Sequence, residues 1–157
     1  QGQVSFEVLG TRLLTQFSNN IRNNFGYLNP SEQPPREWHD ILFNQEGRKV
    51  FKEVVPIVSE LIVAHLGSLE IAPATVKRFW LHQANLGMNQ FISKRVLGHE
   101  PDERQAPVIL DEYANTSSAG SVIAFHKYQQ DLQAGDVGVL CAFGAGYSAG
   151  SVVMRRL

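Results

Sequence analysis

Short apolar runs alternate with helix-length segments along most of this chain, and this alternation restricts the fold more than any other feature. Runs of strand length occur at residues 6–14, 78–82, 107–110, 137–143 and 149–154. Apolar residues spaced three and four apart predict a helix over residues 48–66. Two more helices are predicted, over residues 85–97 and from Ser117 or Ser118 to about residue 133. This order predicts an α/β fold with a mixed five-stranded sheet, helices on both faces, and antiparallel pairing of the last two strands.

The composition is that of a globular protein without an extreme charge. The 157 residues are 43% hydrophobic and 18% charged, and the net charge is −1, so we expect neither nucleic acid nor a membrane as partner. Every apolar run ends before the roughly 18 residues of a membrane span. One cysteine cannot form an internal disulfide, and residues 1–6 lack a secretory signal, so we expect a cytoplasmic protein. The first residue is not Met, which suggests a fragment or a processed chain.

Local signals predict where the regular elements end. Gly98 suits the C-cap of the helix over residues 85–97. Pro56 lies inside the first helix, where a kink or a missing hydrogen bond is expected. Residues 18–46 are rich in Asn, Pro and Gly, so they predict a long connection with few regular elements.

Two polar residues, His82 and Asn115, each stand near the point where an apolar strand gives way to a helix. An imidazole and a carboxamide that face one position would form a two-donor site for a developing oxyanion. Each residue also has a simpler interpretation. A lone histidine at a strand end is most often structural, and Asn115 suits an Asx turn or a helix cap.

The other reactive groups have structural interpretations. Cys141 lies within an apolar strand without a basic neighbour, as expected for a buried structural thiol. Residues 143–150 have G-x-G-x-x-x-G spacing and precede a strand, so they predict a tight hairpin or a close backbone approach to a ligand, not a nucleotide loop. The histidines and the cysteine lack metal-site spacing, and we predict no metal. Without a nucleophile in a recognisable elbow, the chain has the character of half an active site.

Three motifs in this order resemble the C-terminal half of a β-ketoacyl-acyl-carrier-protein synthase III, a thiolase-fold condensing enzyme. They are Leu-His-Gln-Ala-Asn at 81–85, Tyr-Ala-Asn-Thr-Ser-Ser-Ala at 113–119, and Ala-Phe-Gly-Ala-Gly at 142–146 with Gly-Ser at 150–151. The resemblance covers nearly the whole chain, including the helix at 50–54. The long loop and residues 115–121 resemble the branch that handles medium-chain acyl-CoA, the β-ketodecanoyl-ACP synthases.

The resemblance implies one half of a layered α-β-α-β-α arrangement. Residues 1–20 would be the terminal strand of the N-terminal half and the start of the connection. Residues 21–46 would form the long loop, and residues 47–157 the C-terminal thiolase-like half-domain.

The implied reaction is a decarboxylative Claisen condensation of an acyl-CoA with malonyl-ACP in fatty-acid biosynthesis. His82 and Asn115 would stabilise the malonyl enolate, and the absent N-terminal half would supply the nucleophilic cysteine. The backbone N–H of Ala145 would complete a second oxyanion hole. The implied partners are that N-terminal half, acyl carrier protein and, for the complete enzyme, a second copy in a homodimer. No cofactor is implied beyond the substrates.

The resemblance also assigns binding residues. Asn85 matches a position that contacts the pantetheine arm, and Gly47 and Phe51 match positions lining the same tunnel. Lys94 and Arg95 match a basic pair thought to dock the carrier protein, although a solvated helix face explains them equally well.

Three positions depart from the family pattern. Gly87 stands where an arginine often aids carrier docking, which puts the docking surface in doubt. Ala114 and Ala145 stand where glycine is common, and both could reshape the acyl tunnel.

Two alternatives stay open at this level. One is a condensing enzyme of secondary metabolism that uses a CoA-bound extender. The other is a non-catalytic half-domain that dimerises or binds acyl-CoA without turnover. A cysteine in a strand-to-helix turn of the missing half would argue against the second.

Overall fold

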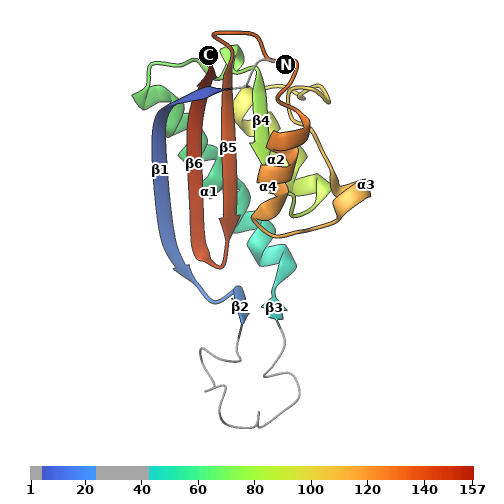
Figure 1. Ribbon diagram of the computed structural model, residues 1–157. Helices are drawn as coiled ribbons and strands as arrows, with labels where there is room; N and C mark the ends of the chain where they lie inside the picture. Colours follow the sequence, from blue (N-terminus) through green and yellow to red (C-terminus); the bar gives the residue numbers. More distant parts are fainter. Residues whose placement is uncertain (1–4, 24–42) are drawn as a thin grey trace, which may run out of the picture.

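The computed structural model describes residues 5–23 and 43–157, and a four-stranded sheet forms its centre (Figure 1). The strands run in the order β1 (Phe6–Ser18), β6 (Gly146–Arg156), β5 (Val137–Gly144) and β4 (Arg78–Leu81). β4 and β5 are parallel, whereas β6 is antiparallel to both β5 and β1. The predicted antiparallel pairing of the last two strands is confirmed.

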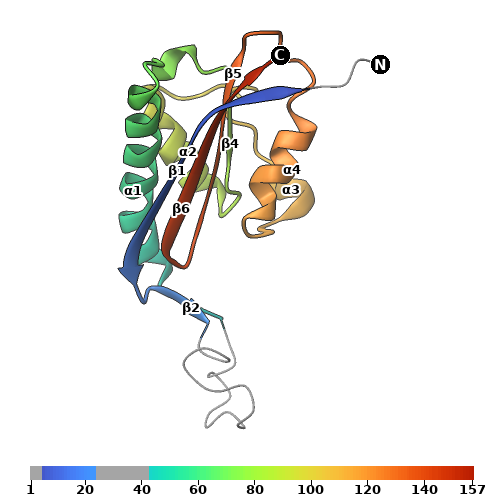
Figure 2. The ribbon, with the colours of Figure 1, turned by 60° about the vertical axis from the view of Figure 1, so that its left-hand side comes forward.

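Helices cover both faces of the sheet, as predicted (Figure 2). One face carries α1 (Gly47–Ser68) and α2 (Leu86–Leu97), and the other carries α3 (Leu110–Tyr113) and α4 (Ala119–Lys127). A short 3-10 turn, η2 (Pro73–Thr75), precedes β4. The larger buried cluster joins α1 and α2 to the sheet, and a smaller one lies on the α4 side around Trp80, Ile109 and Ala124.

The predicted helix ends are partly confirmed. Gly98 caps α2 with a φ of 79°, and its N–H donates to the Lys94 carbonyl at 2.8 Å. α1 continues through Pro56, whose ring nitrogen has no N–H to donate to the preceding turn. Among the described residues, no helix is both long and apolar enough to cross a bilayer.

The prediction of a strand at residues 107–110 is wrong, so the main sheet has four strands within the described ranges, not five. Residue 107 is a proline, which has no N–H for a ladder. The segment still runs beside β4, because the Phe79 N–H donates to the Gln105 carbonyl at 2.7 Å. The Gln83 side chain then takes the place of a ladder: its Nε2 reaches the Pro107 carbonyl at 3.3 Å, and its Oε1 accepts from the Ile109 N–H at 3.1 Å.

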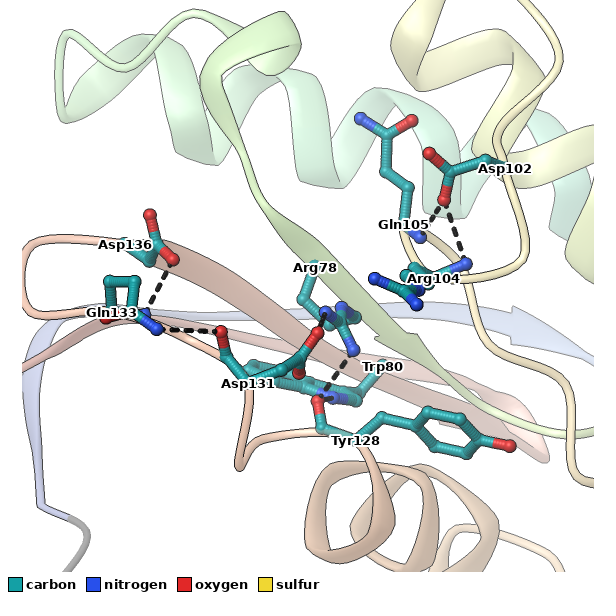
Figure 3. Close-up of polar contacts among 9 residues, drawn as sticks. All are labelled: Arg78, Trp80, Asp102, Arg104, Gln105, Tyr128, Asp131, Gln133 and Asp136. Carbon is teal, nitrogen blue, oxygen red and sulfur yellow. Dashed lines mark hydrogen bonds and ion pairs between the residues drawn. The ribbon is translucent and has the colours of Figure 1, made fainter.

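The last helix is shorter than predicted and ends at Lys127 instead of about residue 133. Two buried side chains of β4 use the Tyr128 carbonyl, Arg78 through Nη1 at 3.0 Å and Trp80 through Nε1 at 3.1 Å. Arg78 also pairs with Asp131 at 2.8 Å, and this hydrogen bond lowers the pKa of the Asp131 carboxyl (Figure 3). These contacts with β4 turn the chain away from the helix axis after Lys127.

The connection before α1 contains one short pair of strands. β2 (Ile21–Asn23) and β3 (Phe43–Gln45) pair antiparallel within the loop predicted over residues 21–46. The loop's central residues, 24–42, lie outside the described part. β1, which the resemblance assigns to the end of the N-terminal half, pairs with β6 along most of its length.

Candidate active site

A cavity of about 490 Å³ opens where β4 and β5 end. Because these strands are parallel, their carboxyl ends lie at the same edge of the sheet, and the loops that follow them meet there. The β2–β3 pair and α1 close the other side. The lining residues are Ile21, Phe43, Gln45, Val50, His82, Ala84, Met88, Asn115, Ser117, Phe143, Gly144 and Ala145. The structure therefore brings both proposed oxyanion donors to one cavity.

His82 is held firmly and is 6% exposed. Its backbone N–H donates to the Cys141 carbonyl at 2.8 Å, and its ring lies 4.5 Å from the Phe143 ring, centroid to centroid. Burial lowers the pKa of the imidazole, while a backbone hydrogen bond with Ser117 acts in the opposite direction. The ring is therefore neutral at pH 7. Its Nδ1 is enclosed and has no partner in the described ranges. The contact with the Ser117 backbone therefore involves Nε2, which a group bound in the cavity would share with that backbone.

Asn115 is exposed at the rim and makes the Asx turn that its sequence context suggests. Its Oδ1 accepts from the Ser117 N–H at 2.9 Å. Since that N–H can only donate, the carboxamide oxygen must face it, and Nδ2 has no hydrogen-bond partner within the described part of the chain. The structural and the functional interpretation of Asn115 are thus compatible. The turn orients the carboxamide that the cavity would use.

The loop around Asn115 has an unusual backbone. Ala114 has a φ of 52° and Ser117 a φ of 58°, a region that favours glycine. Such conformations cost roughly 1–3 kcal/mol and persist where surrounding contacts impose them. The departure noted at Ala114 therefore falls where the backbone would suit the glycine common in the family.

Gln83 is a site residue that the sequence did not single out. Its side chain is fully buried, and besides its contacts with Pro107 and Ile109 its Nε2 donates to the Leu81 carbonyl at 3.0 Å. It also packs against α4, since a Cβ at Gly120 would lie 2.9 Å from the Gln83 Cβ. Gln83 thus joins the strand that carries His82 to the segment that leads to Asn115. A glutamine directly after an apolar strand was the available signal, because a buried amide needs partners.

The residues near the end of β5 differ in their accessibility. Ala145 is exposed in the loop between β5 and β6 and lines the cavity. Cys141 is fully buried, and burial raises the pKa of its thiol to about 12. The prediction of a structural thiol at Cys141 is confirmed. A group so hard to ionise is not the nucleophile.

The predicted pantetheine residues lie outside the wall of this cavity. The Asn85 side chain caps α2 by accepting from the Met88 N–H at 2.9 Å. Gly47 is the exposed first residue of α1. Phe51 lines a separate groove of about 560 Å³ between α1 and α2. A Cβ at Gly87 would contact both Asn85 and Phe51, at 3.4 and 3.6 Å, so these two residues adjoin one another.

The predicted docking pair borders the same groove as Phe51. Lys94 and Arg95 both line it, and both are about half exposed. Lys94 pairs with Glu100 at 2.5 Å, and Arg95 lies 3.9 Å from Glu60. Exposed ion pairs of this kind are weak, so both side chains can exchange partners. Within the described ranges, no group of three or more His, Cys, Asp or Glu residues could hold a metal ion.

Comparison with curated proteins gives close relatives. The chain is 62% identical over 151 residues to a beta-ketodecanoyl-[acyl-carrier-protein] synthase of Pseudomonas aeruginosa, covering 96% of this chain and 43% of that protein. It is 39% identical over 111 residues to a beta-ketoacyl-[acyl-carrier-protein] synthase III of Gloeobacter violaceus, covering 69% of this chain and 33% of that protein. The chain therefore spans less than half the length of these relatives.

Solved structures of low identity share the fold. A beta-ketoacyl-[acyl carrier protein] synthase III of Thermus thermophilus superposes with a TM-score of 0.79 at 21% identity, over 98% of this chain and 48% of that one. A 3-oxoacyl-[acyl-carrier-protein] synthase III of Aquifex aeolicus gives 0.73 at 24% identity, over 99% and 46%. The thiolase-like fold expected from the resemblance is confirmed.

A protein-family model matches more than half of the chain. Residues 66–156 match the family described as 3-oxoacyl-[acyl-carrier-protein (ACP)] synthase III C terminal. This stretch contains His82, Asn115 and Ala145, the three residues placed at the cavity by the sequence and the structure. The chain belongs to the 3-oxoacyl-[acyl-carrier-protein] synthase III family and carries its C-terminal part.

Proposed function

We propose that the protein containing this chain condenses an acyl-CoA with malonyl-ACP by a decarboxylative Claisen reaction, as an acyltransferase of fatty-acid biosynthesis. The observation that carries the proposal is the shared cavity, which both His82 and Asn115 line, with the Asn115 carboxamide oriented by its hydrogen bond to the Ser117 N–H. The names of the relatives in Pseudomonas aeruginosa and Gloeobacter violaceus support this reaction class. The name of the Pseudomonas relative favours a medium-chain acyl group.

In the proposed reaction, His82 and Asn115 stabilise an enolate. When malonyl-ACP loses carbon dioxide, the carbon–carbon bond to the carboxylate breaks. Its electron pair stays on the remaining acetyl-ACP and is delocalised onto the thioester carbonyl oxygen as an enolate. His82 Nε2–H and Asn115 Nδ2–H donate to that oxygen, where negative charge grows. A neutral imidazole suits this role, because it donates without needing a counter-ion in a buried site.

The acyl group comes from the other half-reaction. A cysteine in the remainder of the protein takes the acyl group from CoA as a thioester, and the Ala145 N–H donates to the oxyanion of this transfer. The enolate carbon then attacks that thioester, releases the cysteine and forms β-ketoacyl-ACP. The reaction needs no cofactor beyond its substrates.

The proposal also covers the partners and the binding surface. Phe51, Asn85 and Gly47 would lie along the path of the pantetheine arm, and Lys94 and Arg95 would meet acidic carrier protein at the outer groove. The complete enzyme would act in the cytoplasm as a homodimer, without nucleic acid or membrane partners.

The direct test replaces each donor in the complete protein. His82→Ala and Asn115→Ala should each lower the rate of malonyl-ACP decarboxylation by about 10²–10³-fold, as expected for a lost oxyanion donor. Carbon dioxide release from labelled malonyl-ACP measures this step without the acyl group. Gln90→Ala, on the exposed surface of α2, is the control. Decarboxylation at the unmodified rate in both donor variants would refute the proposed role.

A further inference from the structure

Three segments around the cavity meet at one polar cluster, which we call the Glu53 clamp and define as Asn20, Glu53 and Tyr147. The Tyr147 hydroxyl donates to Glu53 Oε2 at 2.7 Å. Asn20 Nδ2 donates to the same oxygen at 2.9 Å and lies 3.2 Å from the Tyr147 hydroxyl. One carboxylate oxygen thus joins α1, the start of β6 and the turn between β1 and β2.

The Glu53 clamp is buried enough for its hydrogen bonds to stabilise the arrangement of its three residues. Tyr147 is 2% exposed and Glu53 is half-buried. Burial raises the pKa of the Tyr147 phenol, so the hydroxyl keeps its proton and donates it to the carboxylate. Hydrogen bonds to a charged group contribute roughly 1.5–3 kcal/mol, and an orphaned buried hydroxyl is costly. The three residues are therefore held together as one unit.

Each member of the clamp lies close in sequence to a residue of the cavity wall. Asn20 directly precedes Ile21, Glu53 follows Val50 by one helical turn, and Tyr147 follows Ala145 by two residues. The Asn20 carbonyl also accepts from the Glu46 N–H at 2.9 Å, directly before α1. The clamp itself does not line the cavity. Through its hydrogen bonds it joins three of the segments that form the wall.

We propose that Tyr147 and Glu53 are positioning residues that hold the Ala145 backbone N–H in place for acyl transfer. This inference rests on the proposed function. In that transfer the cysteine sulfur bonds to the acyl carbon, the carbonyl electrons move onto oxygen, and their return expels CoA as its thiolate. The donor must lie where that oxygen becomes charged, and small displacements of such groups slow reactions strongly.

The clamp should act on one half-reaction more than on the other. Ala145 is connected to it through Gly146 and Tyr147. His82 and Asn115 are held by other groups, namely the Cys141 carbonyl, the Ser117 backbone and Gln83. Loosening the clamp therefore changes acyl transfer, whereas decarboxylation of malonyl-ACP keeps its donors.

The experiment uses Tyr147→Phe in the complete protein and measures the two half-reactions separately. Quenched-flow mass spectrometry follows transfer of the acyl group from octanoyl-CoA to the protein, since condensation adds two carbons to give the β-ketodecanoyl product named for the Pseudomonas relative. Carbon dioxide release follows decarboxylation. We expect acyl transfer to slow by about tenfold or more, and decarboxylation to stay within about twofold. The loss should appear in the rate constant of transfer, with the KM for octanoyl-CoA little changed.

Three further variants define the result. Glu53→Gln keeps an oxygen acceptor of the same shape and should slow acyl transfer less than Tyr147→Phe does. The double variant should be no slower than Tyr147→Phe alone, because both changes break one unit. Tyr128→Phe makes the same chemical change at a residue of the opposite face and should leave both half-reactions unchanged.

The outcomes separate this inference from the proposed function. If the unmodified protein performs neither half-reaction, the proposed function fails. If it performs both, and Tyr147→Phe and Glu53→Gln slow them equally or leave them unchanged, the positioning role is wrong. If Tyr147→Phe does not fold, Glu53→Gln alone decides in the same way, since selective loss of acyl transfer supports the role and any other pattern refutes it.

Discussion

His82 and Asn115 line the same cavity, yet the protein holds them in different ways. His82 is buried at the end of a core strand, with its backbone tied to β5 and its ring against Phe143. Asn115 is exposed on a loop that contains two residues with positive φ and is fixed by its own Asx turn. The histidine depends on the core for its position, whereas the asparagine depends on local backbone geometry.

This difference shows how a carboxamide on an exposed loop can still be oriented. The carboxamide oxygen of Asn115 accepts from the Ser117 N–H, and this fixes the direction in which its NH2 group points. Ser117 also contacts His82 through its backbone, so one residue of the loop touches both donors. Three experiments should distinguish the support of His82 by the core from the support of Asn115 by its turn. They come in decreasing order of expected effect.

Asn115→Asp should have the largest effect, because it keeps the turn but replaces the NH2 donor with a negatively charged oxygen. A carboxylate still accepts from the Ser117 N–H, but it has no donor and places a negative charge beside the developing enolate. We expect decarboxylation to fall by about 10³-fold or more, below the rate of Asn115→Ala. The rate of carbon dioxide release from malonyl-ACP measures it. An aspartate variant faster than the alanine variant would show that the turn, not the donor, is what matters.

Gln83→Leu should weaken the connection between β4, which leads to His82, and the segment that leads to Asn115. It leaves the Leu81 and Pro107 carbonyls and the Ile109 N–H without their side-chain partner in the core. Each orphaned buried group costs about 1–3 kcal/mol, so the free energy of unfolding should fall by several kcal/mol, and decarboxylation should slow as Asn115 shifts. Urea denaturation of the complete protein measures the stability. Gln90→Leu, on the exposed side of α2, should change it by less than about 0.5 kcal/mol.

The smallest effect is a pH dependence of the free energy of unfolding, and it should come from buried His82 and not from exposed Asn115. Burial lowers the pKa of His82 below its usual value, so under mildly acidic conditions the unfolded state binds a proton that the folded state does not. Unfolding free energy should therefore decrease as pH falls below about 6.5, by at most about 1.4 kcal/mol per pH unit for one proton, until the folded-state pKa is passed.

Buried His65, whose pKa is lowered by burial and by Arg12, adds to this dependence. Urea denaturation between pH 5 and pH 8 should show a smaller slope in His82→Gln and an unchanged slope in Asn115→Ala. Equal slopes in His82→Gln and the unmodified protein would mean that His82 does not contribute.

The sequence by itself determined the elements with strong periodicity and the position of His82 at the end of β4. The spacing in α1, the C-cap at Gly98 and the apolar runs of β4, β5 and β6 depend on neighbours within a few residues, so they could be predicted. His82 does follow β4, but Asn115 follows α3, because the strand predicted at residues 107–110 does not form. The expectation of a shared site therefore rested on one correct element boundary and one wrong one.

Only the tertiary structure decided the features that depend on distant partners. Gln83 replaces a fifth strand with side-chain hydrogen bonds, Arg78 and Trp80 take the Tyr128 carbonyl at the end of α4, and Asn20, Glu53 and Tyr147 meet from three separate segments. A periodic pattern records which face of an element is buried. It does not record which distant polar group will satisfy a buried amide, carbonyl or hydroxyl, because that depends on the packing of the whole chain.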